Sequence, residues 1–248
     1  MQYFGILETK YEELFVTSSF MYFNREDETI TAKELEELIK TTKNRKKNIA
    51  GTIFLYNPIV TPVGFDSNKF LLEQDFDQFG EYIELKSENY ITTFKQAMAA
   101  QCEGKLVEIK NLFNLNEKNI DASQLLMKFN EDLESYNSAQ NTEFDRDIMY
   151  LDAQNIIPAG KFVFFAWGEK INPKEFTNID DYARLIFQRT VQMGKKVAFV
   201  YKKEKTLDGS IEYLQFGSPA QYSKYKHAIG HSIRKSFETN PPIPVAYE

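Results

Sequence analysis

Apolar residues fall into short runs that alternate with segments of helical periodicity. Four runs read as strands buried on both faces, and a fifth run follows near the C-terminus. They span residues 49–56, 105–110, 161–166, 196–201 and 211–216. Two further runs, 3–7 and 14–23, are rich in residues that favour strands. They predict an edge hairpin at the N-terminus.

Helical periodicity separates these strands. Thr29 or Thr31 can cap a helix over 32–43, in which Leu35, Leu38 and Ile39 share one face. Gly104 and Gly194 follow two of the predicted helices and suit their C-terminal ends. The remaining predicted helices lie at 89–101, 121–136, 142–155, 179–193 and 220–237, and the pattern over 70–84 is ambiguous.

Strands that alternate with helices indicate an α/β fold, because neighbouring parallel strands need a crossover connection. We expect a three-layer α/β/α sandwich around a mainly parallel sheet of four to five strands. The simplest organisation is one domain over residues 1–248. It has an N-terminal hairpin and helix at 1–47, a core at 48–237 and an extended tail at 238–248.

The composition limits which ligands and metal ions the chain is expected to bind. The 248 residues carry a formal net charge of −6, so nucleic-acid binding would need a local basic patch. For two basic clusters, at 40–47 and 224–235, solvated helix faces are the favoured interpretation. Cys102 is the single cysteine, and its place on a predicted helix indicates a buried thiol. His227 and His231 have the spacing of a metal pair but no evident third ligand, so neither a metal nor a cofactor is expected.

No apolar stretch approaches the roughly 18 residues that a membrane span needs, and no signal peptide is visible. The sequence therefore predicts a cytoplasmic protein without a membrane partner.

Polar and aromatic residues follow the predicted strands. They are Asn57-Pro58, Asn111-Leu112-Phe113, Trp167-Gly168 and Phe216-Gly217-Ser218-Pro219. In a parallel sheet these strand ends share one edge, where ligands of open α/β sheets bind. A carboxamide can match the edge of a nucleobase, an aromatic ring can stack on it, and a helix N-terminus suits a phosphate.

Each residue also has a structural interpretation. The asparagines can close strands through turn hydrogen bonds. Trp167 can belong to the core, and Ser218-Pro219 can be an N-cap with proline in the first helical turn.

The order Asn-Pro, Asn-Leu-Phe, Ala-Trp-Gly and Ser-Pro resembles an uncharacterised bacterial and phage family, and its layout is similar to the uracil-DNA glycosylase superfamily. The resemblance covers about residues 49–237. It implies that Asn57, with Pro58, holds the attacking water and that Asn111 reads the flipped base. It also implies that Phe65 stacks on the base, that Trp167 is a further substrate-binding residue, and that Ser218, with Pro219, touches phosphate or base.

The chain departs from these patterns. Phe216 stands where the superfamily places a histidine, and no acidic residue precedes Pro58. Asparagine cannot act as a general base, so any base-excision activity is expected to be weak or lost.

Three functions stay open from the sequence. The first is a nucleobase- or nucleic-acid-binding protein on a glycosylase-like scaffold, whose partner is single-stranded or altered-base DNA or a free nucleobase or nucleotide. If active, it would be a DNA base N-glycosylase-like hydrolase. The second is a phage or mobile-element protein that binds a host protein. The third is an enzyme that processes a nucleoside or nucleotide.

Overall fold

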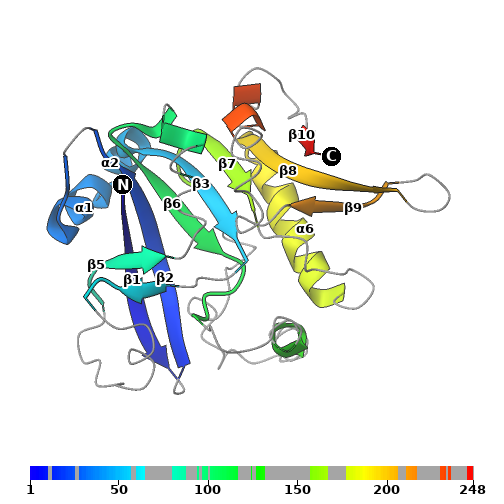
Figure 1. Cartoon of the computed structure of the whole chain (residues 1–248), viewed down its shortest axis with the longest axis horizontal. Coiled ribbons are helices and arrows are strands. Elements are labelled where there is room, and N and C mark those ends of the chain that lie inside the picture. The colour runs from blue at the N-terminus through cyan, green and yellow to red at the C-terminus, as the bar shows by residue number, and fades with distance from the viewer. Residues whose placement is uncertain are drawn as a thin grey trace.

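The computed structural model describes most of the chain. The described residues are 1–10, 13–25, 28–56, 60–64, 80–87, 94, 97–99, 101–116, 124, 127–131, 157–166, 177–205, 211–216, 230–232, 234–235 and 245–247. Its labelled elements are β1 (Gln2–Lys10), β2 (Glu13–Phe23), α1 (Ala32–Ile39), α2 (Thr42–Asn48), β3 (Ile49–Leu55), β4 (Val60–Pro62), β5 (Ile83–Ser87), β6 (Lys105–Asn111), β7 (Phe162–Phe165), α6 (Thr177–Gln192), β8 (Lys196–Lys205), β9 (Ile211–Phe216) and β10 (Val245–Tyr247) (Figure 1).

All ten of these strands belong to one mixed sheet. Nine of them lie in the order β10-β8-β7-β3-β6-β2-β1-β5-β4, and β9 pairs with β8 outside this path. The five strands from β10 to β6 pair in parallel. Numbered by their order in the chain, these five lie side by side as 2-1-3-4-5. This is one of the two common arrangements of doubly wound α/β sheets.

The rest of the sheet is antiparallel. β2 pairs with β6, β1 with β2, β5 with β1, β4 with β5, and β9 with β8. The prediction of an α/β fold is therefore confirmed, whereas the prediction of a mainly parallel sheet of only four to five strands is wrong. The N-terminal hairpin is not an edge, because it lies between β6 and β5. The tail also contributes a strand, since Val245–Tyr247 pairs with β8.

Helices cover both faces of the parallel strands. Phe94 and Met98, which lie on a helical segment between β5 and β6, pack with Ile53 and Phe164 on one face. On the other face, Phe187 of α6 contacts Phe165, whose ring stacks on Phe54. The face with α6 also receives α1, where Leu35 is fully buried with Phe20 and Leu106.

Local capping explains where the first helices lie. Thr31 and Glu34 form a capping box that starts α1, as the sequence indicated for Thr31. The single helix predicted over 32–43 ends early, at Ile39, because the Thr41 side chain accepts a hydrogen bond from the Asn44 N–H and starts α2.

Two glycines allow the backbone before β7 to touch β3. Gly160 has φ +74°, and a Cβ there would collide with backbone atoms of Ala50 and Gly51. A Cβ on Gly51 would meet the Phe162 ring at 2.5 Å. The Lys161 N–H donates to the Ala50 carbonyl at 2.8 Å. Only glycine leaves room for this approach, which sets β7 beside β3.

Cys102 is buried with the core cluster of Phe94 and Met98, as expected. Burial raises the pKa of its thiol from 9.0 to about 12. The folded state therefore favours the neutral thiol, and its contribution to stability is complete below pH 9 and declines as the pH rises toward 12.

We expect the free energy of unfolding to fall between pH 9 and 11, with Cys102 contributing up to about 1.4 kcal/mol per pH unit. Urea denaturation of the wild type and of Cys102→Ala at several pH values measures this contribution. The variant should show the shallower decline, and equal declines in both proteins would contradict the assignment.

Candidate functional site

The described structure brings the carboxyl ends of three parallel strands together. Asn111 lies in register with Leu55, so β6 and β3 end side by side. The Phe113 N–H donates to the Tyr56 carbonyl at 3.0 Å, and the Ala166 N–H donates to the Phe54 carbonyl at 2.8 Å. Among the described residues, Asn111 therefore lies where the carboxyl ends of β6, β3 and β7 meet.

The carboxyl edge also contains the point where the sheet changes its winding. The helical residues between β3 and β6 pack on one face, whereas α6, between β7 and β8, packs on the other. In the chain, β3, β6 and β7 are the first, second and third parallel strands. In the sheet, β3 lies between β6 and β7, so the winding direction reverses between β3 and β7. Open α/β sheets bind ligands at such a position, outside the carboxyl ends of the strands.

Two buried asparagines at this edge differ in how their carboxamides are used. Asn116 accepts from the Val60 N–H and donates to the Val60 carbonyl, both at 3.0 Å, and so fastens β4 to the end of β6. Asn111 is only 2% exposed, and within the described part of the chain its Oδ1 atom has no hydrogen-bond partner. Leaving a buried polar atom unsatisfied costs about 1–3 kcal/mol. Hydrogen bonds that close a strand explain why Asn116 is buried, but they do not explain the buried oxygen of Asn111.

Aromatic rings line the same edge. Phe113 and Phe129 stack with their centroids 3.7 Å apart, and Tyr56 lies 5.4 Å from Phe113. The Tyr56 hydroxyl is also buried and, among the residues that the structure describes, has no hydrogen-bond partner. Burial raises the pKa of Tyr56 well above its ordinary value, so the phenol remains neutral and can donate a hydrogen bond.

Sequence reasoning singled out six other residues. Asn57, Pro58, Phe65, Trp167, Ser218 and Pro219 all lie outside the described residues. Of the predicted site, the structure thus places Asn111, together with the strand ends that precede Asn57 and Trp167. The prediction that all four strand ends share one edge is wrong, because β9, which precedes Ser218, runs antiparallel to β8 and so ends in the opposite direction. Tyr56 was missed, although its position directly after a buried strand was the available signal.

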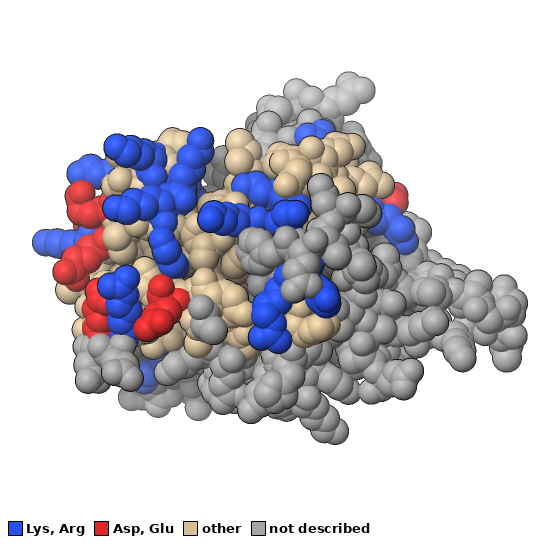
Figure 2. All heavy atoms as spheres, turned by 90° about the horizontal axis from the view of Figure 1, so that it is seen from above, with Lys and Arg blue, Asp and Glu red and all other residues tan. Residues whose placement is uncertain are grey.

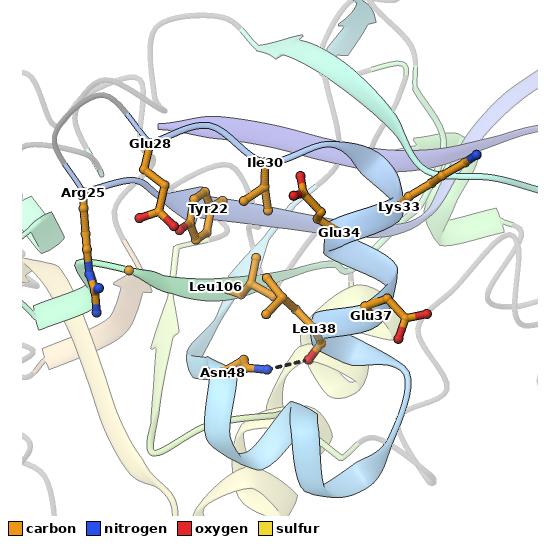
Figure 3. Close-up of a pocket in the computed structure, with 11 residues that line it drawn as sticks. Tyr22, Arg25, Glu28, Ile30, Lys33, Glu34, Glu37, Leu38, Asn48 and Leu106 are labelled. Carbon is orange, nitrogen blue, oxygen red and sulfur yellow. Dashed lines mark hydrogen bonds between the residues drawn. The ribbon is translucent and has the colours of Figure 1, made fainter.

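A cavity lies elsewhere in the described structure, between α1 and the strands β2 and β6. It has a volume of about 530 Å³ and is lined by Tyr22, Arg25, Glu28, Ile30, Lys33, Glu34, Glu37, Leu38, Asn48, Gly104 and Leu106 (Figure 3). Burial, and then the Glu28 carboxylate, raises the pKa of Tyr22. Glu34 caps α1 and Glu37 pairs with Lys40 at 2.9 Å, so two of its three carboxylates already have structural partners.

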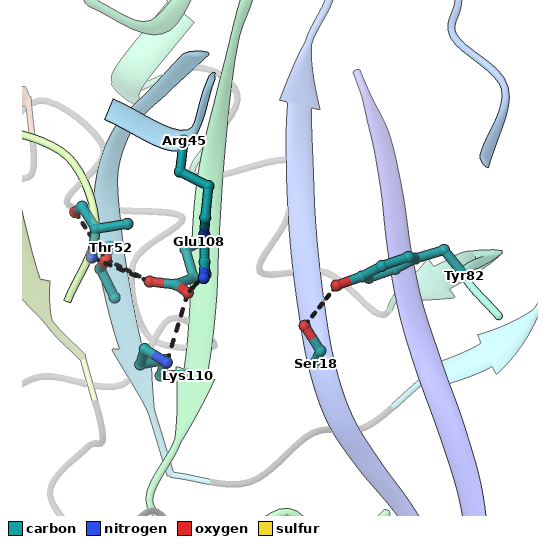
Figure 4. A network of polar contacts seen from close by, with 7 residues as sticks. Ser18, Arg45, Thr52, Tyr82, Glu108 and Lys110 are labelled. Atoms are coloured by element: carbon teal, nitrogen blue, oxygen red, sulfur yellow. Dashed lines mark hydrogen bonds and ion pairs between the residues drawn. The ribbon is translucent and has the colours of Figure 1, made fainter. Parts of the chain in front are cut away.

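A buried carboxylate, Glu108, lies in the middle of the sheet and was not singled out from the sequence. Figure 4 shows its ion pairs with Arg45 at 2.9 Å and Lys110 at 3.5 Å. The Thr52 hydroxyl and the Ala159 N–H donate to its other oxygen at 3.0 and 3.1 Å. With both oxygens occupied, Glu108 connects α2, β3 and the segment before β7 and has a structural role.

Comparison with family models, with curated proteins and with solved structures found no match. Among the helices of the described residues, none has the length and apolar character required to cross a membrane. Within the same residues, no group of three or more His, Cys, Asp or Glu side chains is arranged to hold a metal ion.

Proposed function

We propose that the chain binds a nucleobase, either free or within a nucleic acid, at the carboxyl edge of its parallel sheet. The Asn111 carboxamide reads the hydrogen-bonding edge of the base. The observation that carries this proposal is the buried Asn111 Oδ1, which has no partner among the described residues and lies at the edge where doubly wound sheets bind their ligands. A ligand that donates a hydrogen bond to this oxygen would remove the cost of leaving it unsatisfied.

The chemistry of the Asn111 Oδ1 atom indicates which ligands fit. A carboxamide oxygen accepts hydrogen bonds, so the ligand must present an N–H group, as the imide edge of uracil or the amino group of adenine does. The neutral Tyr56 hydroxyl at the same edge offers a donor for a carbonyl oxygen. An imide edge provides both kinds of group, and we therefore favour a uracil-like base.

The resemblance to the uracil-DNA glycosylase superfamily supports the same class of ligand. On this scaffold, Asn57 would orient a water molecule toward the N-glycosidic bond of an extruded base. Without a carboxylate at this position there is no general base, so we propose weak or lost hydrolysis beside retained base recognition.

Uncharged ligands test the proposal without any contribution from phosphate binding. We expect saturable calorimetric binding of uridine, and at least tenfold weaker binding of 3-methyluridine, which lacks the imide N–H. Asn111→Leu should lose uridine binding, while its free energy of unfolding should stay within about 1 kcal/mol of the wild type, because it removes an unsatisfied buried group.

The neighbouring asparagine provides the matched control for stability. Asn116→Leu breaks both hydrogen bonds to Val60, and we expect it to lower the free energy of unfolding by about 2 kcal/mol. Absence of saturable binding for uracil, hypoxanthine, adenine and their nucleosides would contradict the proposal. Unchanged uridine affinity in Asn111→Leu would contradict the role of Asn111.

A further inference from the structure

Lysines lie at the amino end of every strand in the four-stranded parallel group β6-β3-β7-β8. Lys46 and Lys47 precede β3, Lys105 begins β6, and Lys161 directly precedes β7. Lys195 and Lys196 lie at the start of β8. Because these strands run in parallel, all of their amino ends share one edge. The lysines are scattered through the sequence but are collected by the fold into one row, the amino-edge lysines.

A cavity opens within this row. It has a volume of about 490 Å³, and Lys46, Lys47, Lys105 and Lys161 line it together with Ile49, Ala50, Gln101 and Phe162. None of these described lining residues is acidic. Figure 2, which views the molecule from the side where β3 and β6 begin, shows Lys and Arg side chains gathered over this surface. Low-dielectric walls around charges of one sign strengthen the local potential.

Carboxylates do not neutralise these lysines within the described residues. The Lys105 ammonium donates to the Lys47 carbonyl at 2.8 Å, and the Lys195 ammonium donates to the Gly160 carbonyl at 3.0 Å. Neutral carbonyl oxygens accept these hydrogen bonds without cancelling the positive charges, and of these two lysines only Lys195 is near enough to Glu108 for that carboxylate to favour its charge. By contrast, Lys40, Arg45 and Lys110 each pair with a glutamate.

The lysines also disfavour one another's charge. Burial lowers the pKa of Lys195; the Glu108 carboxylate acts in the opposite direction, and the positive charge of Lys46 lowers the pKa by a smaller amount. The fold therefore holds like charges close together, and a bound anion would relieve their repulsion.

The length of the row favours a linear polyanion over a single phosphate. Neighbouring strands lie about 4.8 Å apart, so a row across four strands extends over about 14 Å. One strand of duplex DNA carries a phosphate every 3.4 Å or so along the helix axis, and about four phosphates fit this length.

We propose that the amino-edge lysines bind the sugar-phosphate backbone of a nucleic acid without reading its sequence. This site lies at the edge of the sheet opposite Asn111 and does not depend on base binding there. It gives an acidic chain the local basic patch that nucleic-acid binding requires.

The test compares two triple variants with the same change in net charge. Lys46→Gln/Lys47→Gln/Lys161→Gln removes three amino-edge lysines, and Lys33→Gln/Lys40→Gln/Lys86→Gln removes three exposed lysines elsewhere. Fluorescence anisotropy with a labelled single-stranded 20-mer at 50 to 200 mM salt measures their affinities. We expect the amino-edge variant to bind 10- to 100-fold more weakly and the control variant to bind within about threefold of the wild type. The slope of log K against log salt should fall by about 2 in the amino-edge variant, because three phosphate contacts contribute roughly 0.7 each.

Equal losses in both triple variants would show a net-charge effect and overturn the proposal. Absence of oligonucleotide binding by the wild type, or tight binding of pyrophosphate without oligonucleotide binding, would do the same. Thermal melts establish that each variant is folded, and Lys46→Glu/Lys161→Glu provides an independent variant that should bind more weakly still. Asn111→Leu should keep the backbone affinity while it loses uridine, so the base site and the backbone site can fail separately.

Discussion

Gly160→Ala is expected to lower the free energy of unfolding by about 4 kcal/mol. Two costs combine in this variant. The backbone of Gly160 has φ +74°, a conformation that costs a residue with a Cβ about 1–2 kcal/mol. In addition, the new Cβ would collide with the backbone of Ala50 and Gly51, which belongs to the central strand β3 and cannot move away as a flexible side chain can.

Gly194→Ala is the matched control for Gly160→Ala. Gly194 has φ +70° just after the end of α6, but apart from its own chain neighbours no described residue has an atom within 4 Å of the position that a Cβ would occupy. It should therefore lose only the conformational part, about 1 kcal/mol. Chemical denaturation of both variants measures the difference. Equal losses would show that the contact between β3 and the segment before β7 is loose enough to relax.

Glu108→Ala is expected to lower the free energy of unfolding by about 3 kcal/mol. The Ala159 N–H would lose its carboxylate acceptor inside the protein, and the Thr52 hydroxyl would keep only the Ala159 carbonyl, at 3.0 Å. Arg45 is 46% exposed and can turn to water, so most of the loss comes from the buried groups.

Glu108→Gln separates the charge from the hydrogen bonds. The amide keeps one oxygen that can accept from Thr52 and Ala159, so we expect a loss of only about 1 kcal/mol. Denaturation curves of the two variants under the same conditions provide the comparison. If Gln and Ala were equally damaging, the ion pairs with Arg45 and Lys110 would matter more than the hydrogen bonds.

The sequence predicted those parts of the fold that local patterns determine. The four parallel strands of the core could be located because continuous apolar runs are typical of strands buried on both faces. The capping residue Thr31 and the glycines at 104 and 194 were also recognisable from local chemistry. The same reasoning identified Asn111 as the end of a buried strand.

Pairing between distant segments could not be predicted in this way. Residues 14–23 have the same composition whether they form an exposed hairpin or join the sheet beside β6, as they do. The amino-edge lysines could not be recognised as a group from the sequence either. Lys47, Lys105 and Lys161 are far apart in the chain, and only the strand order shows that they are neighbours. Glu108 was not singled out from the sequence, because only its partners Arg45, Thr52 and Ala159, which are distant in the chain, reveal its role.

The position of β2 has a consequence for how the chain matures. During synthesis the N-terminal hairpin leaves the ribosome about eighty residues before β6, the strand that completes its hydrogen bonding. Until then, the free side of β2 is an unprotected sheet edge that can pair with other chains. Late arrival of this partner favours slow folding. Conversely, a chain that lacks residues 1–23 would lack β2 and leave one side of β6 unpaired. Such a chain should be more prone to aggregate.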